Sequence, residues 1–275
     1  MIELKSAGEI DIMRRAGRVV GGLLEHLTGL VRPGIATKAL DGAARTYLRE
    51  SGAEPAFLGY RGFPASICVS VNEQVVHGIP GERLIQDGDL VSIDAGAVVS
   101  GFHADAAVTL IVGSSTPSAR RLVETTRRAL AAGIQRAVVG NRLSDISHAV
   151  QETVEREGFG VVRDFVGHGI GRALHEDPPI PNFGPPDMGP RLRAGMVLAI
   201  EPMVTLGGHD VEILGDGWTA VTRDRSLAAH FEHTVAITHQ GVDILTAGAS
   251  EPDMAREPRG SAGRGERTLS PPGVG

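Results

Sequence analysis

The sequence predicts an α+β protein in which an antiparallel sheet forms the core, helices lie outside it, and the two halves of the chain form an internal pseudo-twofold repeat. Three observations predict this class. Residues 90–105 have the pattern of a β-hairpin, a pair of helices precedes strands in each half, and short motifs recur in the same order in both halves. We expect one domain over residues 1–247, with half-repeats at about 6–113 and 117–240.

Two helices are expected at the start of the first half. Ser6 followed by Glu9 is a capping-box pattern, and it opens a helical stretch that is over by Pro33-Gly34. A second helix is expected over about 37–52, because Gly52 is suited to end it. The run 66–76 that follows has the composition of a strand.

The hairpin at residues 90–105 is the most informative stretch of the chain. If Ser100-Gly101 forms a two-residue loop, Asp105 faces Gly96 and Asp94 faces Ala107. The two aspartates then share one face as diagonal neighbours, with Cβ atoms roughly 7–8 Å apart. The opposite face is apolar and is expected to be core. Two buried carboxylates need protons, basic partners or metal ions, whereas a solvated polar face is the alternative at this point.

The second half predicts the same order of elements. A helix is expected from Pro117 to about 139, Gly140 interrupts it, and a second helix follows over about 144–157. The residues of 159–166 are typical of a strand.

Short motifs support the repeat. Val-His-Gly-Ile at 76–79 is echoed by Gly-His-Gly-Ile at 167–170. In each half a glycine lies six positions before an acid that ends an apolar strand, and these acids are Asp94 and Glu201. The repeat therefore predicts that Asp94 and Glu201 occupy equivalent places near a pseudo-twofold axis.

Composition excludes several classes of function. The net charge of −6 gives no basic footprint, so no specific nucleic-acid partner is expected. The single cysteine, Cys68, cannot form an internal disulfide, and no apolar run suits a membrane span or a secretory signal. A cytoplasmic protein is expected. Residues 248–275, dominated by Gly, Pro, Ser, Arg and Glu, predict a disordered tail.

Further candidate ligands lie in the second half. His168 and His175 occur in a glycine-rich stretch, where surface histidines are the alternative interpretation. Glu201 and Glu232 lie within apolar, strand-like runs, where an ionised carboxylate is costly unless it is paired or coordinated. Together with the two hairpin acids they indicate cations. Four carboxylates and one imidazole suit Mn, Fe, Co or Zn, and the number of ligands suits a dinuclear site.

Seven of these residues follow one order along the chain: His77, Asp94, Asp105, His168, His175, Glu201 and Glu232. Their contexts are Ile93-Asp94, Gly101-Phe102-His103-Ala104-Asp105, Gly167-His168-Gly169-Ile170-Gly171, Ile200-Glu201-Pro202-Met203 and Phe231-Glu232-His233-Thr234. In this order and spacing they closely resemble the type I methionine aminopeptidases, over roughly residues 5–240. The resemblance implies the pita-bread fold, and it implies metal-dependent removal of the initiator methionine, by activated water, before small second residues.

The resemblance also implies roles for individual residues. The ligands of two divalent ions (Co, Mn, Fe or Zn) would be Asp94, Asp105, His168, Glu201 and Glu232, with Asp105 and Glu232 bridging. The catalytic residues would be His77, His175 and Glu201, with both histidines also contacting substrate. The methionine pocket would involve Tyr60, Phe63, Cys68 and Trp218, together with Phe57 and Leu174, although ordinary core is the favoured interpretation of Phe57. The partners would be nascent polypeptide N-termini and, transiently, the ribosome, with the enzyme acting as a monomer away from membranes.

Two alternatives stay open on the sequence. Ala95-Gly96-Ala97 after Asp94 also occurs in relatives that act at X-Pro bonds, although those usually carry a further amino-terminal domain for which this chain has no room. A non-catalytic binding protein on the same fold is the second alternative, and the presence of all five ligands disfavours it. Phe57, Arg61, Phe63 and Leu174 depart from the residues that many bacterial relatives carry, which affects the shape of the pocket.

Overall fold

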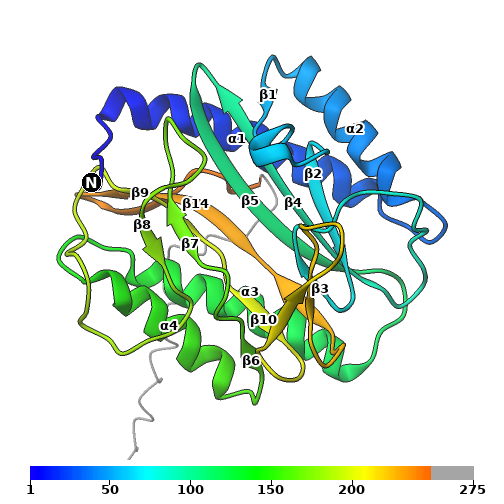
Figure 1. Ribbon diagram of the computed structural model, residues 1–275. Coiled ribbons are helices and arrows are strands. Elements are labelled where there is room, and N and C mark those ends of the chain that lie inside the picture. The colour runs from blue at the N-terminus through cyan, green and yellow to red at the C-terminus, as the bar shows by residue number, and fades with distance from the viewer. Residues whose placement is uncertain (249–275) are drawn as a thin grey trace, which may run out of the picture.

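The structure is a computed structural model that describes residues 1–248, so the tail predicted for 248–275 lies outside the described residues apart from Gly248. Its four α-helices in this part of the chain surround a central sheet (Figure 1). The helices are α1 (Ala7–Leu30), α2 (Thr37–Glu50), α3 (Pro117–Arg136) and α4 (Leu143–Glu155), with a short 3-10 turn, η1 (Tyr60–Gly62), after α2.

The helix boundaries follow local capping chemistry. The Ser6 hydroxyl accepts a hydrogen bond from the Glu9 backbone N–H, and the Glu9 carboxylate accepts one from the Ser6 N–H, so the predicted capping box opens α1. Thr116 caps α3 by accepting from the Ala119 N–H, with Pro117 in the first turn. The helices expected over 37–52 and 144–157 correspond to α2 and α4.

The strands of the two halves differ in length, and two of the predicted strand runs are only partly strand. The first half has β1 (Glu54–Pro55), β2 (Ile67–Val71), β3 (Gln74–Val76), β4 (Leu90–Val99) and β5 (Phe102–Ile111). The second half has β6 (Gly160–Val161), β7 (Gly167–Gly169), β8 (Glu176–Ile180), β9 (Val197–Ile200), β10 (Met203–Thr205), β11 (Val211–Ile213), β12 (Ala220–Thr222), β13 (Ala228–His230), β14 (Glu232–Thr238) and β15 (Gly241–Ile244). The run 66–76 is divided because Asn72 adopts a positive φ of 60°, and 159–166 yields only β6.

The predicted hairpin register is confirmed. Val99 pairs with Phe102, Gly96 with Asp105, and Asp94 with Ala107, with Ser100 and Gly101 in the turn at positive φ. The apolar face of β4 and β5 packs under α1 and α2, where it contributes Ile93, Ala95, Ala97, Ala104 and Ala106 to a buried cluster. The two aspartates are thereby directed to the other face of the sheet.

The central sheet reflects the predicted repeat. Reading outward from its middle, β5, β4 and β2 pair in sequence on one side, and β14, β9 and β7 pair in sequence on the other. The halves join where β5 pairs with β14, at Ala107 with Glu232 and at Ala106 with His233. Helices α3 and α4 share apolar clusters with β9 and β14, as α1 and α2 do with β4 and β5 (Figure 1).

Two three-stranded sheets complete the architecture. One has the order β13-β10-β6 and the other β11-β12-β3. They support His77, which follows β3, and His230, which ends β13. Among residues 1–248, no helix is long and apolar enough to cross a bilayer.

Candidate metal centre

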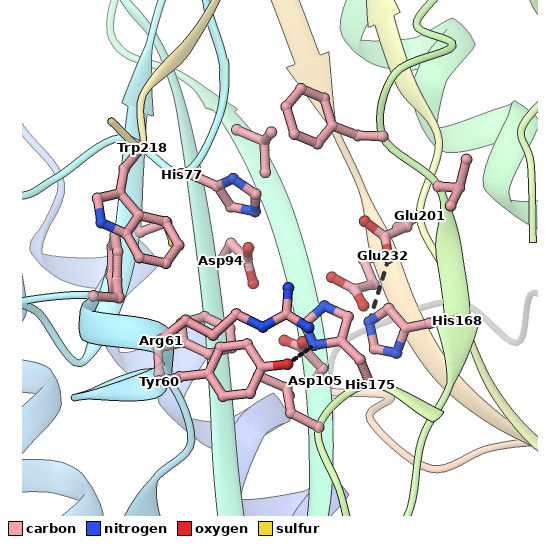
Figure 2. Close-up of a pocket in the computed structure, with 17 residues that line it drawn as sticks. Tyr60, Arg61, His77, Asp94, Asp105, His168, His175, Glu201, Trp218 and Glu232 are labelled. Carbon is pink, nitrogen blue, oxygen red and sulfur yellow. Dashed lines mark hydrogen bonds and ion pairs between the residues drawn. The ribbon is translucent and has the colours of Figure 1, made fainter. Parts of the chain in front are cut away.

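One pocket collects every residue that the sequence predicts for the site. Figure 2 shows the carboxylates of Asp94, Asp105, Glu201 and Glu232 turned toward a common centre, with His168 beside Glu201. The lining consists of Phe57, Tyr60, Arg61, Phe63, Cys68, Val76, His77, Asp94, Asp105, Phe165, Val166, His168, Leu174, His175, Glu201, Trp218 and Glu232.

The acidic residues come from both halves of the sheet. Asp94 and Asp105 project from β4 and β5, and Glu232 is the first residue of β14. Glu232 pairs with Ala107, the residue that also lies opposite Asp94 on the other neighbouring strand. Glu201 directly follows β9, so the joint between the halves brings all four carboxylates together.

Burial makes this cluster costly in the absence of cations. Asp94 Oδ1, Asp105 Oδ1 and Glu232 Oε1 are buried and have no hydrogen-bond partner within the described part of the chain. Burial raises the pKa of Asp94 to about 7. It also raises the pKa values of Asp105, Glu201 and Glu232 well above their usual range, and the neighbouring carboxylates raise them further. Orphaned carboxylate oxygens of this kind fit divalent cations.

His168 presents a lone pair to the cluster. Its Nδ1 lies 2.9 Å from the Gly169 carbonyl, which can only accept, so Nδ1 carries the proton. Nε2 is then unprotonated and lies 3.5 Å from Glu201 Oε1. Burial, with a smaller contribution from His175, lowers the pKa of His168 to about 3 and keeps the ring neutral. Donor atoms of Asp105, His168 and Glu232 all lie within 4.8 Å of one another, as ligands of one ion would.

His175 and His77 also line the pocket. His175 Nδ1 lies 2.9 Å from the Tyr60 hydroxyl, and its ring centroid lies 4.2 Å from that of His168. Burial lowers the pKa of His175, helped by the nearby Arg61 charge. His77 has a positive φ of 60° and contacts Trp218 edge-on, and burial lowers its pKa to about 4.

An apolar recess adjoins the carboxylates. Phe63 meets Trp218 edge to face at 5.1 Å, and Cys68 pairs with Asp94 across β2 and β4. Burial raises the pKa of the Cys68 thiol, so it stays protonated. Phe57 is buried in the core and also lines the recess, so it is both a core residue and a pocket residue. An apolar side chain suits such a recess.

Sequence reasoning missed His230. This histidine is 1% exposed, and burial, followed by the nearby His77, lowers its pKa to about 3. Three donor atoms, one each from Glu201, His230 and Glu232, lie within 4.8 Å of one another. The sequence held one indication: His230 and Glu232 are two positions apart in an extended segment, and alternate residues of a strand share a face.

This fold and this carboxylate-rich site define a metallopeptidase. The chain belongs to metallopeptidase family M24, whose family model matches residues 11–239. It is 55% identical over 246 residues to the methionine aminopeptidase of Clostridium perfringens, and 54% identical over 246 residues to methionine aminopeptidase 1 of Bacillus subtilis. Each alignment covers 90% of this chain and 99% of the relative.

A solved structure gives the same result for the fold. The crystal structure of methionine aminopeptidase from Thermotoga maritima superposes with a TM-score of 0.89 at 48% identity, covering 90% of this chain and 100% of that one. The predicted pita-bread fold and the resemblance to methionine aminopeptidases are therefore confirmed.

Proposed function

We propose that this protein removes the N-terminal methionine from polypeptides by metal-dependent hydrolysis, with a preference for small second residues. The observation that supports it most strongly is the convergence of four buried carboxylates and a neutral imidazole beside an apolar recess. Relatives with 54–55% identity along nearly their whole length are methionine aminopeptidases. The recess formed by Phe63, Cys68 and Trp218 would receive the methionine side chain.

The proposed metal ligands are Asp94, Asp105, His168, Glu201 and Glu232. They would hold two divalent cations, with Asp105 and Glu232 as the proposed shared ligands, and Co, Mn, Fe and Zn all suit this mixture of oxygen and nitrogen donors. When bound, such cations supply a water molecule that ionises near neutral pH and a positive charge that polarises the peptide carbonyl.

The remaining steps fall to side chains of the chain itself. Glu201 would accept the proton of the attacking water and deliver it to the departing amine, because its carboxylate lines the pocket beside His168. His175 would stabilise the oxygen of the tetrahedral intermediate. For this role its Nε2 must carry the proton, and the Tyr60 hydroxyl, 2.9 Å from Nδ1, is placed to donate to the unprotonated Nδ1 of that tautomer. His77, held against Trp218, would contact the substrate backbone.

We further propose that the substrates are nascent chains in the cytoplasm and that the enzyme acts as a monomer, with transient contact to the ribosome. The net charge of −6 supports the expectation that no specific nucleic acid is bound.

Peptide hydrolysis tests the activity. The purified protein, supplied with Co or Mn, should release methionine from Met-Ala-Ser and leave Ala-Pro peptides intact. Cleavage of the Ala-Pro peptide instead would favour the X-Pro alternative, and inactivity on both with every metal would contradict the proposal.

Ligand variants test the assignment. Asp105→Asn and Glu232→Gln should lose metal uptake and turnover together, because each removes a bridging carboxylate while keeping the side-chain shape. A variant that keeps both properties would show that the assigned residue is not a ligand.

A further inference from the structure

Backbone hydrogen bonds hold His230 next to two of the clustered carboxylates, Glu201 and Glu232. Its backbone N–H donates to Thr109 Oγ1 at 2.8 Å, and the Thr109 hydroxyl donates back to the His230 carbonyl at 2.7 Å. Strand β13 also pairs His230 with Met203 of β10. The side chain is 1% exposed. The fold thus fixes the backbone that carries this imidazole, and the ring is shielded from solvent.

The imidazole has an unsatisfied nitrogen. Nε2 is buried and has no hydrogen-bond partner among residues 1–248. Its distance to the Glu232 carboxylate oxygen Oε2 is 3.9 Å, which is too long for a hydrogen bond. Leaving a buried polar nitrogen without a partner is unfavourable, so its retention beside two carboxylates calls for a ligand.

The distance fits two donors on one ion. Ligand atoms lie about 2.0–2.2 Å from a borderline cation, so two of them on the same ion are separated by about 3–4.2 Å. The 3.9 Å from His230 Nε2 to Glu232 Oε2 falls within this interval, as does the 3.5 Å from His168 Nε2 to Glu201 Oε1. Glu201, His230 and Glu232 also meet as a group, with donor atoms within 4.8 Å.

We propose that His230 is a sixth ligand of the metal centre. With Glu201 and Glu232 it forms one cation subsite. The group of Asp105, His168 and Glu232 is a different set of ligands. The inference rests on the proposed function only in that the same centre binds cations. Two imidazoles instead of one favour Co, Fe and Zn over Mn, because nitrogen donors suit borderline cations better than hard ones.

Counting coordinated imidazoles tests the proposal. The full chain loaded with cobalt is examined by proton NMR, in which the ring N–H of each histidine bound to Co(II) gives a strongly shifted, exchangeable resonance. Wild type should show two such resonances, from His168 and His230, and His230→Gln should show one. The number of shifted resonances in the wild-type spectrum tests the proposal without any variant. The test therefore does not depend on whether the His230→Gln protein folds.

Metal titration provides a second readout. His230→Gln should weaken the affinity for Zn at one site by about tenfold or more and change Mn binding much less. The matched control is His239→Gln, which makes the same substitution at an exposed histidine beyond β14 and should leave both affinities unchanged. Circular dichroism and thermal melting confirm that each variant is folded.

The outcomes separate the two proposals. A wild-type protein that binds cobalt, hydrolyses Met-Ala-Ser and shows one shifted imidazole resonance overturns the role of His230 and leaves the proposed function standing. Unchanged Zn affinity in folded His230→Gln overturns it as well. A protein that binds no cobalt at all contradicts both.

Discussion

The ring of His168 is oriented by the peptide that follows it. Because the Gly169 carbonyl accepts from Nδ1, the lone pair of Nε2 points toward Glu201 before any cation arrives. His175 is oriented in a comparable way by the Tyr60 hydroxyl. At the residue scale, therefore, the chemistry of each imidazole depends on the partner of its other nitrogen.

Tyr60→Phe tests this dependence. Loss of the hydroxyl removes the hydrogen-bond partner of His175 Nδ1, so the tautomer with the proton on Nε2 is no longer favoured. We expect kcat to fall by about tenfold, which corresponds to one hydrogen bond of roughly 1.4 kcal/mol, and KM to change less. Steady-state kinetics on Met-Ala-Ser measures the effect. Tyr47→Phe is the matched control, because Tyr47 stacks on His26 in the helical layer and should keep wild-type kinetics. Equal kcat values for the two variants would contradict the role assigned to Tyr60.

At the element scale, β7 is a strand of three residues packed tightly against its neighbours. A Cβ atom on Gly167 would lie 2.4 Å from the Ala199 carbonyl oxygen, which belongs to the backbone of β9 and cannot move aside cheaply. Glycine at this position lets β7 approach β9 closely, and His168 is the next residue along the strand. The packing of one glycine thus sets the position of a proposed ligand.

Gly167→Ala should therefore displace β7 and His168 together. We expect a loss of about 1–3 kcal/mol in the free energy of unfolding and weaker cation binding, measured by denaturant titration and metal titration. The matched control is Gly42→Ala in α2, where a Cβ atom meets nothing within 4 Å. That change should stabilise the protein by about 0.4–1 kcal/mol and leave metal binding intact. Normal cation affinity in folded Gly167→Ala would exclude this effect on His168.

At the scale of the whole molecule, the site lies where the two half-repeats meet. Beyond the paired residues of β5 and β14, the Thr234 hydroxyl donates to the Asp105 carbonyl at 2.7 Å and accepts from the Asp105 N–H at 2.9 Å. The joint itself therefore fixes the backbone of a proposed bridging ligand. Cations bound there would also link the two halves, so metal binding should contribute to global stability.

The pH dependence of the metal-free protein follows from the same burial. The pKa values of His77, His168 and His230 are lowered to about 4, 3 and 3. Above the unfolded-state value near 6.5 these histidines are neutral in both states, so their contribution to stability no longer changes with pH. The pKa of Asp94 is raised to about 7, and the pKa values of the other three carboxyl groups are raised well above their usual range. Above pH 6.5 the unfolded state therefore binds fewer protons than the folded state, and stability falls as pH rises.

The melting temperature of the chelator-treated protein should accordingly decrease between about pH 6.5 and pH 8. Saturating Co should raise it and remove the decrease, because bound cations keep the carboxylates ionised in the folded state. Calorimetry across this interval makes the measurement, and Asp94→Asn, which lacks one of the titrating groups, should show a shallower decrease. A metal-free melting temperature that rises with pH would show that the buried carboxyl groups do not control stability in this interval.

Much of the fold was predictable because it depends on local chemistry. The capping box at Ser6, the turn at Ser100-Gly101 and the alternation along β4 and β5 each act over a few residues, so the start of α1 and the hairpin register were predicted correctly. Asn72 shows the limit: its positive φ divides an apolar run into two strands that pair with different partners.

The sequence by itself identified residues that line the pocket, and it predicted that two alike halves would bring Asp94 and Glu201 toward one centre. Only the tertiary structure joined His230 to Thr109 and Tyr60 to His175, and set the pairing of β5 with β14. The physical reason is sequence separation. A period or a turn constrains near neighbours, whereas contacts between residues more than a hundred positions apart arise only when the packing of both halves has fixed their relative position.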